Sequence, residues 1–386
     1  MGLGLTDVIE VGVEDDVGID KERLAFVRNV FANAHVNILL GSAFSSEVVP
    51  TLGHRESWFQ EVDERLRIQR SVDWDIARSL LRLEYFRSVM LPLRGAKPTP
   101  RQKAFLSAAR RLISDRGTTL LPKRLNVFTT NYDPLIEIAL EELGIPFNDG
   151  FSGRVSPRFD SSSFSRLMCE QSLFMEYISQ VTTANVLKLH GSLTWRRGED
   201  KAIAYSNVED VLVSCLNGCR GAIDLSVVDK VKELVASLCS ETGISALEDM
   251  ASNLTEGEKE LIQTFGRNYD STMCVVNPAK KKFEETVLEQ SYYDLLRIFA
   301  NELDRNNALL LVFGFSFADE HIRELTKRAA RSNPKLLIII SCYHREDAEI
   351  YRSYFPDMDN VFYLISEEGA TISLGELTEV IKCATN

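Results

Sequence analysis

The segment 125–144 reads LNVFTTNYDPLIEIALEELG, and it predicts a strand, a polar turn and a helix in succession. Leu125, Val127 and Phe128 form a short apolar run of β-preferring residues, which is typical of a buried strand. Four polar or amphipathic residues, 129–132, follow at the predicted end of this strand. Open α/β sheets bind nucleotides at such places, between a strand end and a helix N-terminus.

The helix after this turn has a predicted start and a predicted end. Asp133 suits the N-cap, and Pro134 suits the first helical position, where a missing N–H costs nothing. Gly144 suits the left-handed residue that follows a helix. Apolar residues recur between them at helical spacing, at Leu135, Ile138, Ala139 and Leu143.

Five further apolar runs have the length and composition of strands, and helical patterns separate them. They lie at 36–40, 186–189, 308–313, 336–342 and 361–365. Together with the first strand they predict an α/β fold with a doubly wound, mainly parallel, Rossmann-like sheet. Parallel winding would bring Ser45, Asn131, Asp133, His190 and Ser316 to one edge, where the strands end.

Two stretches without strand patterns interrupt this alternation, at about 54–117 and 198–270. The first predicts helices over 58–68, 74–90 and 99–113, and the second over 227–238 and 245–265. We therefore expect one domain over 21–386 with two helical insertions, preceded by an N-terminal tail at 1–20. The first insertion could cap the nucleotide site or form an oligomer surface.

Composition limits the classes of function. The chain has 386 residues, 45% of them hydrophobic, and a net charge of −12 with a pI near 5.1. The acidic balance disfavours broad contact with nucleic-acid phosphates, although it permits a local basic patch. No apolar run reaches the roughly 20 residues of a membrane span, and we see no signal peptide. The seven scattered cysteines fit a reduced, cytoplasmic environment.

Four motifs resemble those of the sirtuin superfamily, in the order of that family. TTNYD at 129–133 resembles its Thr-x-Asn-x-Asp motif, and LKLHGSLTW at 187–195 resembles its His-Gly motif. NILLGSAFSS at 37–46 is similar to its Gly-Ala-Gly-x-Ser loop, and LLLVFGFSFADEHI at 309–322 to its Gly-x-Ser segment. The complete sequences of these motifs most resemble those of the bacterial sirtuin-like NAD hydrolases of antiphage defence. Among those, they most resemble the partners of the HerA ATPase.

This resemblance implies NAD as the substrate and Asn131 and His190 as catalytic residues. Asn131 would orient the ribose hydroxyls and a water, and His190 would act as general base, a task that suits an imidazole near neutral pH. Asp133 could hold the ribose or order its own turn. The residues expected to contact NAD are Gly41, Ser42, Ala43, Phe44, Ser45, Thr129, Thr130, Asp133, Gly314 and Ser316.

The glycine loop departs from the family pattern at two positions. Ala43 stands where the family has glycine, and Ser42 stands where alanine is usual. A β-carbon at position 43 would narrow the seat for the pyrophosphate.

The spacing of the cysteines differs from that of the deacylating sirtuins, which carry a zinc module with two Cys-x2-Cys pairs. Here Cys215 and Cys219 are separated by three residues, and Cys239 stands alone. Four thiolates at tetrahedral spacing are not available, so we expect no zinc. Water is then the expected nucleophile, and the expected reaction is hydrolysis of NAD+ to nicotinamide and ADP-ribose.

Such a reaction would harm the cell unless it were restrained. The resemblance therefore implies a homo-oligomer whose activity is controlled by a HerA-like ATPase, with the two insertions as the places where control would act. Two alternatives from other classes stay open. One is a protein deacylase or ADP-ribosyltransferase, and the other is a non-catalytic, nucleotide-sensing scaffold subunit.

Overall fold

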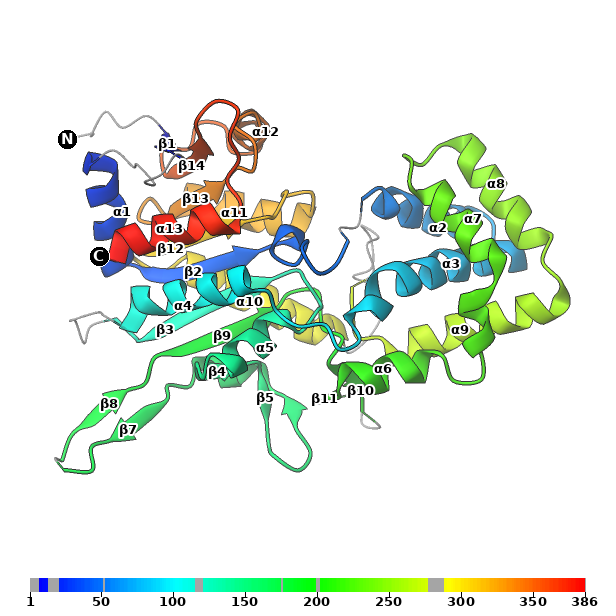
Figure 1. Cartoon of the computed structure of the whole chain (residues 1–386), viewed down its shortest axis with the longest axis horizontal. Coiled ribbons are helices and arrows are strands. Elements are labelled where there is room, and N and C mark those ends of the chain that lie inside the picture. The colour runs from blue at the N-terminus through cyan, green and yellow to red at the C-terminus, as the bar shows by residue number, and fades with distance from the viewer. Residues whose placement is uncertain are drawn as a thin grey trace.

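Eight strands form the main sheet, in the spatial order β1-β14-β13-β12-β2-β3-β9-β4, and every neighbouring pair is parallel (Figure 1). Their bounds are β1 Val8–Val11, β2 His35–Leu40, β3 Arg124–Thr129, β4 Phe147–Asn148, β9 Thr183–Lys188, β12 Ala308–Phe313, β13 Leu337–Ser341 and β14 Val361–Ser366. The structure is a computed structural model, and it describes residues 7–12, 21–50, 53–114, 121–174, 176–198, 202–276 and 288–385.

Helices cover both faces of this sheet. One face carries α1 (Lys21–Asn33), α4 (Pro100–Ser114), α5 (Leu135–Glu142) and α13 (Leu374–Thr385). The other carries α10 (Leu288–Leu303), α11 (Glu320–Ser332) and α12 (Asp347–Tyr354). Within β12, Leu309 and Leu311 enter the first core, whereas Leu310 and Val312 enter the second. The predicted doubly wound, parallel α/β fold with helical insertions is therefore confirmed.

The six predicted strands correspond to β2, β3, β9, β12, β13 and β14. The helix after the polar turn begins at Leu135, one residue later than expected, because Pro134 keeps a non-helical backbone as the residue before it. Gly144 has a φ of +63° and ends that helix as predicted.

The predicted N-terminal tail, 1–20, contains a strand that the sequence patterns did not indicate. Residues Val8–Val11 form β1, which pairs in parallel with β14 of the same chain. Ile9 and Val11 are buried in the same core as residues of α1, which explains why this short segment joins the sheet. Residues 1–6 and 13–20 lie outside the described ranges.

A ladder of asparagines crosses the centre of the sheet. Asn37, Asn126, Asn185 and Asn148 stand in register on β2, β3, β9 and β4. The side-chain amide of Asn126 donates to Oδ1 of Asn37 at 2.9 Å, and that of Asn185 donates to Oδ1 of Asn126 at 3.0 Å. A slip of one strand would break these amide–amide hydrogen bonds, so the ladder favours the observed register.

The two predicted insertions pack together as one helical body. It comprises α2 (Arg55–Ile68) and α3 (Val72–Tyr85) from the first insertion, and α6 (Val208–Cys215), α7 (Ser226–Val235), α8 (Glu241–Ser252) and α9 (Glu256–Thr272) from the second. Trp58, Phe86 and Phe265 are among the buried residues of its core. The third predicted helix of the first insertion, α4, packs on the sheet instead.

Both insertions leave the α/β body where strands end, after β2 and after β9. The helical body consequently faces the carboxyl edge of the sheet, to the right of the strands in Figure 1. Segments on both sides of β9 in sequence form a small antiparallel sheet, in the order β10 (Trp195–Arg197), β11 (Ile203–Tyr205), β6 (Arg158–Phe159) and β5 (Phe151–Ser152). Of these, β11 lies within the predicted second insertion, where no strand was expected. No described helix is long and apolar enough to span a membrane.

Replacement of Asn126 by Ala should lower the free energy of unfolding by about 1–3 kcal/mol, because it removes the partner of two buried amide groups. Chemical denaturation followed by circular dichroism measures this. Asn33→Ala is the matched control, since Asn33 is an exposed asparagine that bonds only within α1. Equal stability of the two variants would show that the ladder does not hold the sheet.

Candidate active site

Three buried polar side chains form one hydrogen-bonded network beyond the ends of β2 and β3. The side-chain amide of Asn131 donates to the carbonyl oxygen of Gly41 at 2.9 Å and to Oγ of Ser45 at 3.0 Å. Ser45 in turn donates to Oδ2 of Asp133 at 2.7 Å. The three side chains belong to residues that are 8%, 4% and 5% exposed, respectively. The structure thus brings together three residues that the sequence placed at one edge.

The two threonines of the motif connect this turn to the neighbouring strand. The Thr129 hydroxyl donates to the carbonyl oxygen of Leu40 at 2.9 Å, and it also accepts the amide of Asn131 at 3.0 Å. The amide of Thr130 donates to the same Leu40 carbonyl at 3.3 Å. Thr129 is fully buried, so its hydroxyl orders the turn.

The glycine loop after β2 is a tight 3₁₀ turn, Ser42–Phe44, pressed against the loop that follows β12. The Gly41 amide donates to the carbonyl oxygen of Phe313 at 3.0 Å. A β-carbon at position 41 would overlap the carbonyl group of Gly314. Because the strand order reverses between β2 and β12, these loops flank the topological switch point, where open α/β sheets bind ligands.

The structure shows how the alanine at position 43 is accommodated. Its β-carbon lies where a side chain at Gly314 would begin, and Gly314 has a φ of +65°, which favours glycine. Ser42 and Ala43 are exposed on one loop, and Ser316 is exposed on the other. Phe44, in contrast, is buried against Phe105 of α4 at a ring-centroid distance of 6.1 Å, so it anchors the loop.

His190 reaches the site from the end of β9. Its Nε2 atom lies 3.1 Å from Oδ2 of Asp319, which follows β12. The strands β3 and β2 lie between β9 and β12, so this contact spans the carboxyl edge of the sheet. The His190 carbonyl accepts the amide of Val276 at 2.9 Å. Gly191 has a φ of +80° and leaves no room for a β-carbon beside the Cys274 carbonyl.

Asp319 also caps α11, because its Oδ1 accepts the amide of Ile322 at 3.0 Å. Burial acts to raise the pKa of Asp319, but the hydrogen bond and charge of His190 and the Ile322 amide outweigh it and hold the pKa below its ordinary value. Sequence reasoning missed the second contact of Asp319, because a cap signal does not reveal a partner that is distant in sequence.

Asp133 orders its own turn. Its Oδ1 atom accepts the amide of Leu135 at 3.1 Å, and its carbonyl oxygen accepts a hydrogen bond from Nζ of Lys188. Lys188 is only 2% exposed and forms an ion pair with Glu137 at 3.1 Å. Burial raises the pKa of Glu137, and Lys188 opposes that shift. The sequence offered one signal for this pair, a lysine inside an apolar strand.

Tyr132 joins the turn to the helical body. Its ring meets the ring of Tyr85 edge-on, with centroids 6.3 Å apart, and its carbonyl accepts the amide of Leu193 at 2.9 Å. Arg55 and Glu84 form a bidentate ion pair beside it, with contacts of 2.7 and 2.9 Å. The residue next to Asn131 is therefore packed between both parts of the molecule.

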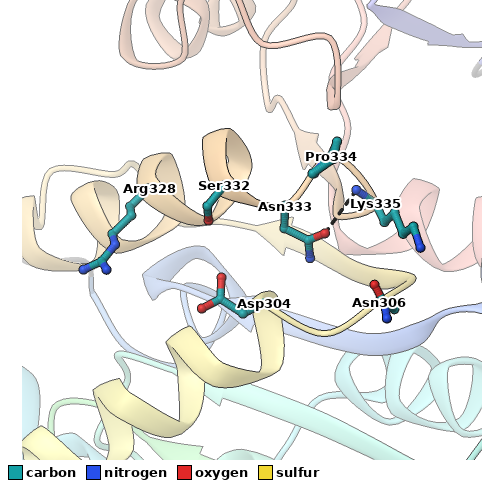
Figure 2. A pocket seen from close by; sticks show the side chains of 7 residues that line it. All are labelled: Asp304, Asn306, Arg328, Ser332, Asn333, Pro334 and Lys335. Atoms are coloured by element: carbon teal, nitrogen blue, oxygen red, sulfur yellow. Dashed lines mark hydrogen bonds between the residues drawn. The ribbon is translucent and has the colours of Figure 1, made fainter.

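A separate hollow of about 460 Å³ lies at the opposite edge of the sheet (Figure 2). Its lining comes from the segments that precede β12 and β13, namely Asp304, Asn306, Arg328, Ser332, Asn333, Pro334 and Lys335. Strands begin at this edge, whereas Asn131 and His190 follow strand ends. The hollow is therefore not part of the candidate site.

Cys215 and Cys219 lie in the core of the helical body, where they pack as small apolar residues. The Cys219 thiol donates to the Cys215 carbonyl at 3.4 Å, and burial raises the pKa of Cys215 to about 12. Across the described ranges, no three His, Cys, Asp or Glu side chains gather as metal ligands would.

Gly41→Ala should destabilise the protein by about 1–3 kcal/mol, because the added methyl group must displace the backbone of the Gly314 loop. Gly221→Ala is the matched control, since its β-carbon would meet no atom within 4 Å. Thermal unfolding of both variants gives the comparison. If Gly41→Ala unfolded with the wild-type midpoint, the close approach of the two loops would be refuted.

Residues 125–214 match the family model described as "SIR2-like domain". Among solved structures, the chain is similar to one described as "Structure of Sir2Tm bound to a propionylated peptide", with 14% identity, a TM-score of 0.44, and coverage of 93% of this chain and 95% of that one. A search of curated proteins gives no match. The matched segment contains Asn131 and His190, the two predicted catalytic residues.

Proposed function

We propose that this protein is an NAD+ glycohydrolase that cleaves the nicotinamide–ribose bond with water. The observation that carries the proposal is the meeting of Asn131, Ser45 and Asp133 in one network at the switch point of the sheet, with His190 at the same edge. The match of the surrounding segment to a SIR2-like domain supports NAD as the substrate.

The reaction converts NAD+ and water to nicotinamide, ADP-ribose and a proton. The electrons of the broken bond leave with nicotinamide, and positive charge develops on the ribose carbon until the water oxygen bonds to it. Both hydrogen bonds of the Asn131 amide group use Nδ2, which leaves Oδ1 to accept from a ribose hydroxyl or the attacking water. His190 accepts the released proton as general base.

The nucleotide would lie against the paired loops after β2 and β12. The amides of Ala43, Phe44 and Ser45 all donate to carbonyl groups of the protein, so the loop does not offer them to a pyrophosphate. The exposed hydroxyls of Ser42 and Ser316, one on each loop, can donate to the pyrophosphate instead. The serine at position 42, unusual for the family, thus compensates for the narrower seat beside Ala43.

Water is proposed as the nucleophile in place of an acyl-lysine. Cys215 and Cys219, the closest approach to a zinc motif in the sequence, serve the packing of the helical body. Deacylating sirtuins hold their peptide substrate beside a zinc module. The burial of these two cysteines in an apolar core supports the proposal that this chain has no such module. The proposal therefore includes no structural zinc and no peptide substrate.

Asn131→Ala and His190→Ala should each reduce NAD+ cleavage by about 10²–10⁴-fold, the usual cost of losing a positioned catalytic group. Nicotinamide release measured by chromatography gives the rate, and circular dichroism checks the fold. His54→Ala, at an exposed histidine of the helical body, is the control and should retain the wild-type rate. Near wild-type turnover in a folded Asn131 or His190 variant would refute their assignment.

We further propose that the protein forms a homo-oligomer and works with a HerA-like ATPase in antiphage defence. Contact between Tyr132 and Tyr85 supports a route by which a partner on the helical body could alter the turn that carries Asn131. An exposed apolar tip on the hairpin of β7 (Cys169–Gln171) and β8 (Ile178–Gln180) supports self-association, since Leu173 and Phe174 are each 93% exposed.

Mass photometry of the chain should show a species larger than the 43.5 kDa monomer. Its size should increase, and its NAD+ turnover should change, when a HerA-like ATPase is added. The double variant Leu173→Ser with Phe174→Ser should shift the chain toward smaller species, whereas Val155→Ser, at a solitary residue that is 97% exposed, should not. A strictly monomeric chain whose rate of NAD+ cleavage is the same with and without the ATPase would contradict this part of the proposal.

A further inference from the structure

We propose that Asp319 is a positioning residue that holds His190 as the Nε2–H tautomer, so that Nδ1 is the atom that accepts the proton. The inference rests on the proposed function for its chemistry, and on the 3.1 Å contact between Nε2 and Oδ2 for its geometry. It adds to the site a residue that acts through His190 and assigns a role to each nitrogen of the imidazole.

The two carboxylate oxygens of Asp319 have different tasks. Oδ1 accepts the amide of Ile322 at 3.0 Å and so belongs to the start of α11. Oδ2 is the oxygen that faces His190. Because the first bond ties the carboxylate to a thirteen-residue helix, the second oxygen is presented to the imidazole in a fixed direction.

The loop before Asp319 is equally constrained. Phe317 is fully buried with a φ of +57°, and its ring packs against Phe315 and Phe355 at centroid distances of 5.0 and 5.1 Å. Arg323 of α11 donates to the Phe317 carbonyl at 2.8 Å. A buried aromatic residue with positive φ persists only where its surroundings hold it, so Asp319 stands on a rigid support.

The charge of Asp319 decides the tautomer. Burial alone would raise its pKa, but the hydrogen bond from His190 and the Ile322 amide keep the pKa below the ordinary value, so the group is a carboxylate at neutral pH. A carboxylate only accepts hydrogen bonds, so the nitrogen that faces it must carry the proton. In a neutral imidazole the other nitrogen, Nδ1, then carries the lone pair.

His190 is also fixed through its backbone. Its carbonyl bonds to the amide of Val276, and the next residue, Gly191, pairs with Val275. Within the described ranges no group hydrogen-bonds to Nδ1. The proton of a ribose hydroxyl or of water would move to Nδ1, and the resulting imidazolium charge would be stabilised by the adjacent Asp319 carboxylate. This arrangement follows the general logic of an orienting carboxylate behind a catalytic histidine.

The direct test is ¹⁵N NMR of the full chain with labelled histidine, which distinguishes the two neutral tautomers by their nitrogen shifts and couplings. The chain has five histidines, and His190→Gln identifies the signal of interest. Wild-type His190 should be the Nε2–H tautomer. In Asp319→Asn the Asn Oδ1 can still cap α11, but its Nδ2 would face the imidazole as a donor, so His190 should switch to the Nδ1–H tautomer.

Asp319→Asn should also lower kcat for NAD+ cleavage by about 10²–10⁴-fold with little change in KM, because the base carries its proton on the wrong nitrogen. Asp319→Ser separates this effect from capping, since serine can cap α11 but is too short to fix the imidazole. It should give a mixture of tautomers. Ser240→Ala, which removes the cap of α8, is the control for stability and should change neither tautomer nor turnover.

An Nδ1–H tautomer in the wild-type protein would overturn the inference, as would an Asp319→Asn variant with the wild-type tautomer and turnover. If the wild-type protein did not cleave NAD+, the proposed function would fail. The tautomer of His190 would still decide the role of Asp319, because the NMR measurement needs no substrate.

Discussion

The hydrogen bond from the Gly41 amide to the Phe313 carbonyl joins the loops on the two sides of the topological switch point. It depends on two glycines, because a β-carbon at either Gly41 or Gly314 would enter the opposing loop. The loop after β2 then presents the Gly41 carbonyl and the Ser45 hydroxyl to the side-chain amide of Asn131. The loop after β12 presents Asp319 to His190. One close backbone contact thus positions both halves of the candidate site.

The helical body also packs against the turn of the candidate site, at the carboxyl edge of the main sheet. Its two insertions are separated in sequence by β3 and β9, yet they share a single core and return to the sheet beside the site. Tyr132 packs against that core, while Asn131 and Asp133 on either side of it belong to the polar network. A movement of the helical body would therefore act on the turn of the motif directly, without a long chain of intermediate contacts.

The sequence predicted most of the fold because buried parallel strands have a strong local signal. LLLVF in β12 is buried on both faces, and its continuous apolar run is unmistakable. The polar turn at 129–133 is also a local property, since its residue types follow one another directly in the sequence. A lysine inside an apolar strand signals a buried ion pair, but the sequence does not reveal Glu137 as the partner of Lys188, nor His190 as the partner of Asp319, since the fold alone brings these residues together. β1 was missed because four residues beside an acidic segment carry too little pattern.

The proposed hydrolysis of NAD+ is tested most directly by measuring nicotinamide and ADP-ribose after incubation of the protein with NAD+, with and without an acyl-lysine peptide. We expect equal amounts of nicotinamide and ADP-ribose in the absence of peptide, at a rate that the peptide does not raise. Consumption of NAD+ only when the peptide is present, with transfer of the acyl group to ADP-ribose, would contradict it.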